Sequence, residues 1–126
     1  MRKIFVAGNP LVEQDSLALE VARELEGKLK GIGFEEIEDV EGLEKEKDLY
    51  IMDVAFGIKK VEIVTDLEKL ETVNAVSGHD IDLAMELKLL QKIGRLGKVH
   101  IIAVPANYTV ERAVREAKQL LKRISP

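Results

Sequence analysis

The sequence contains no cysteine and no tryptophan, and it is poor in aromatic residues of every kind. Without cysteine the chain forms no disulfide, offers no thiolate to a metal ion and has no cysteine nucleophile. Phenylalanine and tyrosine make up only 4% of its 126 residues. So few rings make a stacking platform for the bases of single-stranded nucleic acid improbable.

The sequence also lacks an excess of basic residues and a long apolar run. Its 19 lysines and arginines stand against 23 aspartates and glutamates, which gives a formal net charge of −4. Binding to nucleic acid through phosphate contacts is therefore not expected. No run of 18 apolar residues is present, and the segment after Met1 has neither the long apolar stretch nor the small-residue cleavage site of a signal peptide. We expect a cytoplasmic protein that does not insert into a membrane.

Short apolar segments and helix-like segments alternate along the chain. Hydrophobic residues at 46% and charged residues at 33% are typical of a globular protein, and the length suits a single domain, 1–126. Strands are predicted at 3–7, 34–40, 48–55, 60–65 and 99–104. Helices are predicted at 16–30, at 81–93 and after Thr109, which is placed to act as an N-cap. The charged stretch 41–48 reads as a solvated loop or helical turn. The order predicts an α/β three-layer sandwich with a mostly parallel five-stranded sheet flanked by helices.

Polar side chains follow the strands at positions where such sheets bind ligands, beyond the carboxyl ends of the strands. Asp15 lies in the loop after the first strand, Asp53 ends the third strand, and His79 precedes the helix at 81–93. If these ends lie side by side, the three side chains meet in one cleft. Two carboxylates and an imidazole suit a divalent transition metal.

Each of these residues also has a structural interpretation. Asp15 is well placed to cap the first helix. His79 fits an ordinary loop or capping histidine, and we interpret His100 as structural or surface. Asp53 is harder to explain in this way, because its neighbours are apolar and a buried carboxylate usually has a partner. Spacing alone leaves both interpretations open.

Other chemistries have little support in the sequence. The few serines do not stand in a G-x-S-x-G elbow, so a Ser-His-Asp hydrolase is improbable. The turn Gly8-Asn9-Pro10 is not followed by the residues of a phosphate-binding loop, so nucleotide binding is not expected either.

Three motifs together resemble one family. They are Gly8-Asn9 followed by Asp15 after the first strand, Asp53-Val54-Ala55-Phe56-Gly57 at the end of the third, and Ser77-Gly78-His79 before a helix. In this order and context they resemble the hydrogenase maturation proteases. Members of that family remove a C-terminal peptide from the large-subunit precursor of [NiFe] hydrogenases.

The resemblance implies a function and a set of site residues. It implies a metal-assisted endopeptidase in which Asp15, Asp53 and His79 are both the metal ligands and the catalytic residues. The metal is nickel, supplied by the [NiFe]-hydrogenase large-subunit precursor that is the substrate. Asp39 and Gly42 stand where the family has a glycine-rich segment, which implies that they position the substrate.

The sequence departs from the family pattern next to the first ligand. Gln14 replaces the first residue of an acidic pair, and Glu13 and Ser16 replace glycines that often flank this pair. An alternative is therefore a non-catalytic homologue that binds a metal or a partner during hydrogenase assembly, and a third is a structural subunit in which the Asp and His residues are only caps. The segment 56–58 is expected to be an exposed loop suited to substrate docking or to self-association.

Overall fold

The computed structural model describes residues 2–7, 13–37, 41–67 and 81–125, with the backbone alone described at 13–15, 41 and 81–85. In these ranges the elements are β1 (Arg2–Val6), α1 (Glu13–Leu25), β2 (Ile32–Glu36), the 3-10 helix η1 (Glu41–Lys45), β3 (Asp48–Ala55), β4 (Glu62–Val64), α3 (Ile81–Lys92), β5 (Lys98–Pro105) and α4 (Val110–Ile124). None of the described helices is long and apolar enough to cross a bilayer.

One sheet forms the middle layer, and its strand order across the described residues is β2-β1-β3-β5-β4. The strands β2, β1, β3 and β5 are parallel to one another, and β4 runs antiparallel to β5. The prediction of a mostly parallel five-stranded α/β sheet is confirmed. Strand β2 lies at an edge of the sheet in the described part of the chain, where it pairs with β1 alone.

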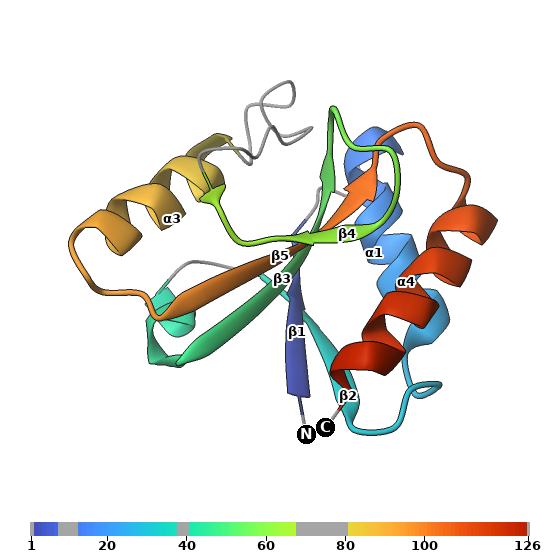
Figure 1. Cartoon of the computed structure of the whole chain (residues 1–126), viewed down its shortest axis with the longest axis horizontal. Helices are drawn as coiled ribbons and strands as arrows, with labels where there is room; N and C mark the ends of the chain where they lie inside the picture. The colour runs from blue at the N-terminus through green and yellow to red at the C-terminus, as the bar shows by residue number, and fades with distance from the viewer. Residues whose placement is uncertain (1, 8–12, 38–40, 68–80, 126) are drawn as a thin grey trace.

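Helices cover both faces of the sheet (Figure 1). On one face α1 and α4 pack together against the sheet, and their buried residues belong to one core with Ile4, Met52 and Ile102. On the other face α3 and η1 contribute Leu87 and Leu43 to a second core. The inner strands are buried on both faces, as expected of parallel strands between two layers of helices.

Local chemistry explains where most elements begin and end. The Oγ1 atom of Thr109 accepts a hydrogen bond of 3.2 Å from the backbone N–H of Arg112, so the predicted N-cap of the last helix is confirmed. The strand predicted at 48–55 and the helix predicted from 81 are found with matching starts. The charged stretch after residue 41 forms the helical turn η1, which is held to the core by the buried Leu43.

Several predicted boundaries were wrong. Helix α1 begins at Glu13 and ends at Leu25, whereas the periodicity suggested 16–30. The apolar Leu29 that extended the pattern lies beyond Gly27, whose φ of 77° ends the helix. Strand β2 begins at Ile32 and ends at Glu36, since it pairs with β1 only over that length.

Gly97 allows β5 to start close to the segment that precedes β3. The backbone N–H of Lys98 donates a 3.0 Å hydrogen bond to the carbonyl of Lys47. A Cβ atom on Gly97 would overlap this carbonyl group, whose backbone position is fixed by the strand that follows. Only glycine fits this approach without moving a strand.

We therefore expect Gly97→Ala to lower the free energy of unfolding by roughly 1–3 kcal/mol, the usual cost of overpacking. Gly42→Ala is the matched control, because a Cβ on Gly42 meets nothing within 4 Å. The control is expected to change stability by less than about 0.5 kcal/mol. Urea unfolding of both variants measures this difference, and equal stabilities would contradict the argument.

Candidate functional site

The strand order changes direction between β1 and β3. From β1 the chain crosses through α1 to β2 on one side, and it then returns through η1 to β3 on the other side. In open α/β sheets, ligands bind outside the carboxyl ends of the strands at such a switch point. Asp53 lies near the carboxyl end of β3 and therefore stands at this position.

Asp53 is the one buried polar or charged residue among the side chains that the structure describes, with 4% of its surface exposed. Alternation along β3 turns its side chain toward the face covered by α3, the same face as Leu49 and Ile51. Its Oδ1 atom accepts a 2.8 Å hydrogen bond from the backbone N–H of Val54. A carboxylate held in this way is stabilised in a place where an isolated charge is costly.

Small side chains surround Asp53 on its face of the sheet. Its register partner in β5 is Ala103, and Ala55 is the next residue of β3 on this face. On the β1 side the N–H of Ala7 donates a 2.9 Å hydrogen bond to the carbonyl of Met52, which places Ala7 beside Asp53. These three alanines are buried, yet none reaches far above the sheet. The Asp53 carboxylate is therefore covered mainly by residues that lie outside the sheet.

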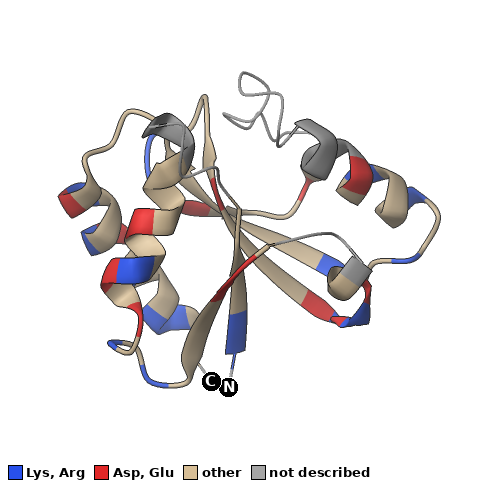
Figure 2. Cartoon of the chain, turned by 180° about the vertical axis from the view of Figure 1, so that it is seen from behind, with Lys and Arg blue, Asp and Glu red and all other residues tan. Residues whose placement is uncertain are grey.

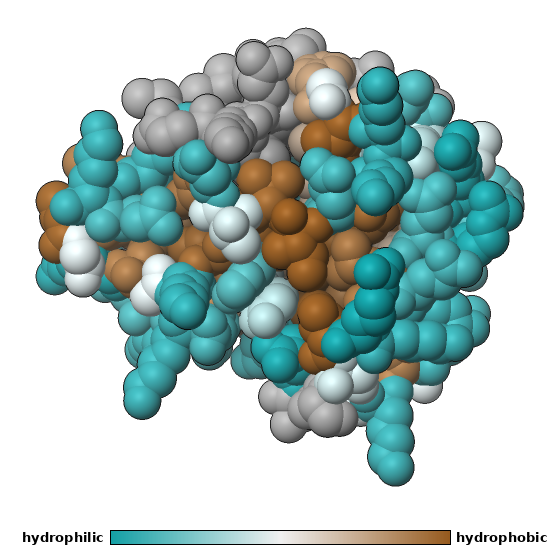
Figure 3. Space-filling model, viewed as in Figure 1, coloured by the Kyte–Doolittle hydropathy of each residue, from teal (hydrophilic) through white to brown (hydrophobic). Residues whose placement is uncertain are grey.

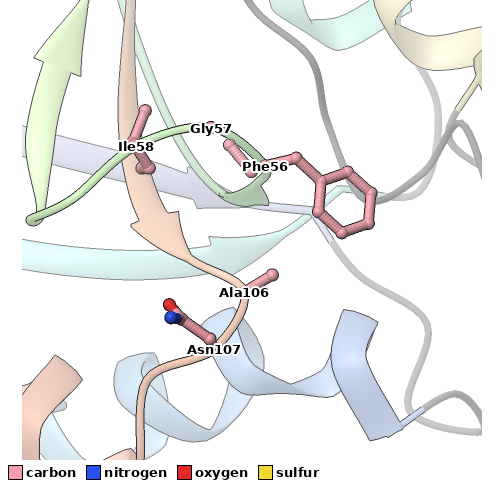
Figure 4. A pocket seen from close by; sticks show the side chains of 6 residues that line it. Phe56, Gly57, Ile58, Ala106 and Asn107 are labelled. Atoms are coloured by element: carbon pink, nitrogen blue, oxygen red, sulfur yellow. The ribbon is translucent and has the colours of Figure 1, made fainter.

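A pocket of about 250 Å³ opens at the carboxyl ends of β3 and β5. The loop after β3 and the turn after β5 form its walls and face one another in Figure 4. Its lining residues are mostly apolar, with one side-chain amide: Ala55, Phe56, Gly57, Ile58, Ala106 and Asn107. The exposed loop predicted at 56–58 thus forms one wall of this pocket and begins three residues after Asp53.

The loop after β3 is fastened to α4 by Glu116 and Tyr108. The carboxylate of Glu116 accepts a 3.1 Å hydrogen bond from the N–H of Val61 and a 3.2 Å hydrogen bond from Nε of Arg112. The Tyr108 hydroxyl lies 2.8 Å from the carbonyl of Lys59 and 2.9 Å from Glu116 Oε1. The Arg112 guanidinium lies over the Tyr108 ring, 4.4 Å from its centre. Sequence reasoning missed this network, because the contacts link residues far apart in the chain.

The network shifts the pKa values of both acids. Desolvation alone would raise the pKa of Glu116, but the hydrogen bonds from Val61, Tyr108 and Arg112 together outweigh it and hold this pKa below its ordinary value of 4.5. Desolvation and the hydrogen bond to Glu116 raise the pKa of Tyr108 above 10.0. At neutral pH, Glu116 is therefore charged and Tyr108 is protonated.

The structure describes the side chains of only some of the predicted site residues. Asp15 lies in the first turn of α1, inside the helix and not at its N-cap, and only its backbone is described. His79 and Asp39 lie outside the described residues. Among the side chains that are described, no three His, Asp or Glu residues form a metal-binding cluster. The metal-ligand assignment therefore stays a prediction, and Asp53 is its one described side chain.

Gly42 and His100 lie away from Asp53. Gly42 is in η1, which lies next to the start of β3, whereas Asp53 is near the other end of that strand (Figure 1). His100 stacks on Tyr50 with ring centres 4.4 Å apart, and its Nε2 atom lies 3.3 Å from Asp48. This position agrees with a structural interpretation of His100. The proposed role of Gly42 in substrate binding stays a prediction.

Comparison with solved structures identifies proteins of similar fold. The sequence matches no protein-family model and no curated protein sequence. The structure is similar to the crystal structure of hydrogenase 2 maturation peptidase from Thaumarchaeota archaeon SCGC_AB-539-E09, with a TM-score of 0.56 and 18% identity over 98% of this chain and 97% of that one. It is also similar to an uncharacterized protein from Wolinella succinogenes, with a TM-score of 0.53 and 18% identity over 98% of this chain and 93% of that one. The chain therefore has a hydrogenase maturation peptidase-like fold.

The network around Glu116 predicts a specific pH dependence of stability. The folded pKa of Glu116 lies below its unfolded value, so its contribution is complete above about pH 4.5 and is lost as the pH falls through the folded pKa. We expect Glu116→Gln to be less stable than the wild type at pH 7, with the difference shrinking on acidification to pH 3. Urea unfolding at both pH values measures this effect.

Glu24→Gln is the matched control for that experiment. Glu24 and Lys28 form an exposed ion pair with the same four-residue spacing as Arg112 and Glu116. Exposed pairs of this kind contribute little, so the control is expected to show a smaller change at pH 7. Equal losses in the two variants would contradict a special role of Glu116.

Proposed function

We propose that this chain is an endopeptidase that removes a C-terminal peptide from the large-subunit precursor of a [NiFe] hydrogenase. The observation that carries the proposal is the position of Asp53, a buried carboxylate at the switch point of a fold that the chain shares with a hydrogenase 2 maturation peptidase. The resemblance of the motifs around Asp15, Asp53 and His79 supports the same activity.

In this proposal the three motif residues bind the nickel ion that the precursor carries. The described parts of the site are compatible with such a ligand. Asp53 offers a carboxylate on a central strand, and its neighbours on the same face of the sheet are alanines, which bring no bulky side chain next to it. Asp15 lies in the first turn of α1, near the positive end of the helix dipole. When bound, the ion supplies Lewis acidity, which polarises a carbonyl or activates a water.

The chain's own residues would position the peptide. The pocket between the loop after β3 and the turn after β5 begins at Ala55, so a peptide bound in it would pass close to Asp53. Its mostly apolar lining suits an apolar side chain, and the amide of Asn107 suits a backbone group. The hydrogen bond from the N–H of Val61 to Glu116 holds the end of this loop against α4, which reduces the cost of ordering the loop on binding.

The activity is tested by the intact mass of a [NiFe]-hydrogenase large-subunit precursor after incubation with this protein. We expect loss of one discrete C-terminal peptide when the precursor carries nickel, and no change when it does not. A hydrogenase maturation protease that cuts the same precursor serves as the positive control. An unchanged mass beside a working control would contradict the activity and favour a non-catalytic binding homologue, for which Gln14 is the sequence evidence.

The role of Asp53 is tested by Asp53→Asn. This change preserves size and a hydrogen-bond acceptor but removes the charge that would bind the ion, so we expect cleavage to fall at least about a hundredfold. Asp48→Asn is the control, because Asp48 is exposed and lies at the other end of the same strand. The control is expected to keep wild-type activity, and both variants to keep a wild-type circular dichroism spectrum. Full activity of Asp53→Asn would contradict the assignment.

A further inference from the structure

The outer end of α3 exposes two large apolar side chains. Leu89 is 59% exposed and Ile93 is 57% exposed, and the next most exposed large apolar residue in the described part of the chain is Phe56 at 36%. Their four-residue spacing puts them next to each other on one side of the helix. Figure 3 shows apolar surface on this side of the molecule, bordered by hydrophilic residues.

Positive charge surrounds this apolar pair. The segment 88–98 contains four basic residues and no acidic one, although the whole chain has a net charge of −4. No ion pair to these four side chains is found among the described residues. Figure 2 shows the last turn of α3 and the chain leading to β5 with basic residues and no acidic one between them. We call Leu89, Ile93, Lys88, Lys92, Arg95 and Lys98 the α3 patch.

Acidic residues limit the α3 patch on two sides. Glu86 lies one turn before Leu89 on the same helix, and Glu44 and Glu46 lie near Lys47, whose carbonyl accepts the N–H of Lys98. The patch is therefore a bounded area at the C-terminal end of α3 and not part of a continuous basic face.

The backbone holds the α3 patch in a fixed shape. Gly94 has a φ of 74°, its N–H donates to the carbonyl of Gln91 at 3.1 Å, and the N–H of Arg95 donates to the carbonyl of Leu90 at 2.9 Å. This pair of hydrogen bonds is the Schellman motif, which closes the end of the helix. Leu87, on the opposite side of α3, is buried in the core and fixes the rotation of the helix.

We propose that the α3 patch is a docking site for an acidic, apolar-containing surface of the folded protein substrate, at a distance from the cleavage site. This inference rests on the proposed function. At a rise of 1.5 Å per residue, Leu89 and Ile93 lie about 12 and 18 Å along the helix from Ile81, the end nearest the segment that contains His79. Contacts there add affinity for the substrate body without touching the reacting atoms.

The composition of the α3 patch favours a protein over other occupants. A membrane-binding helix needs a long apolar face with bulky side chains, whereas among the described side chains of residues 86–98 only two large aliphatic ones are exposed, and the sequence has no aromatic residue between 87 and 98. A two-fold contact with a second copy would place the four cations against themselves. An apolar anchor ringed by charge is typical of the centre and rim of a protein interface.

The test is the double charge reversal Lys88→Glu/Lys92→Glu. Opposite charges steer and hold an acidic partner, so we expect KM for the nickel-loaded precursor to rise roughly tenfold with kcat unchanged, and the effect to shrink at high salt. Leu89→Ser is expected to raise KM as well, with kcat again unchanged and little dependence on salt.

The matched control is Lys118→Glu/Lys122→Glu on α4. These lysines have the same four-residue spacing, Lys122 lies in the last turn of its helix as Lys92 does, and α4 covers the other face of the sheet. The control is expected to keep the wild-type KM. Circular dichroism of all variants shows whether each is folded. Equal KM values in the reversal and control variants would overturn the docking site while leaving the proposed function standing.

Two further measurements separate the remaining outcomes. If the wild type does not cleave the precursor, the proposed function fails, and co-sedimentation of the precursor with wild-type and reversal proteins then tests the docking site by itself. Binding that is lost only in the reversal variant supports the site, and no binding by the wild type overturns it. Binding of the wild type to phosphatidylglycerol vesicles, lost in the reversal variant while KM is unchanged, would assign the α3 patch to a membrane and overturn the proposal.

Discussion

A carboxylate in the buried part of a central strand costs free energy unless its oxygens are hydrogen-bonded or meet a positive charge. Asp53 satisfies part of this need within its own strand, through the N–H of Val54. Its sheet neighbours on the same face are alanines, whereas positions nearer the amino end carry large side chains such as Ile51 and Ile101. On this face the sheet thus carries large side chains toward the amino ends of the strands and small ones toward the carboxyl ends, where a ligand is expected.

The topology decides which segments can reach this position. Because β2 and β3 lie on opposite sides of β1, the chain leaves the carboxyl ends of β1 and β3 in different directions. The loop that follows β3 and the turn that follows β5 instead lie opposite one another and form a pocket beside Ala55. Glu116 on α4 accepts the N–H of Val61, three residues after the last lining residue of this loop, so the helix layer on one face restrains the loop that forms one wall of the pocket.

The proposed chemistry and the proposed docking lie on different parts of one scaffold. Asp53 is held by strand pairing in the middle of the sheet, and the α3 patch lies at the outer end of a helix. A protein substrate that is folded away from its cleaved end offers such distant surfaces. Separating them allows affinity to come from exposed charges and an apolar pair, while the buried carboxylate is reserved for the reaction.

The sequence by itself determined the alternation of strands and helices, because apolar periodicity follows from the geometry of each element. It thereby determined the parallel sheet, the N-cap at Thr109 and the place of Asp53 at the end of a strand. Local periodicity did not determine the ends of α1 and β2, which depend on Gly27 and on the length of pairing with β1. Only the tertiary structure showed the three alanines beside Asp53, the link from Glu116 to Val61 and the exposure of Leu89 and Ile93. These features depend on which residues from distant segments meet, and that is set by packing and not by local pattern.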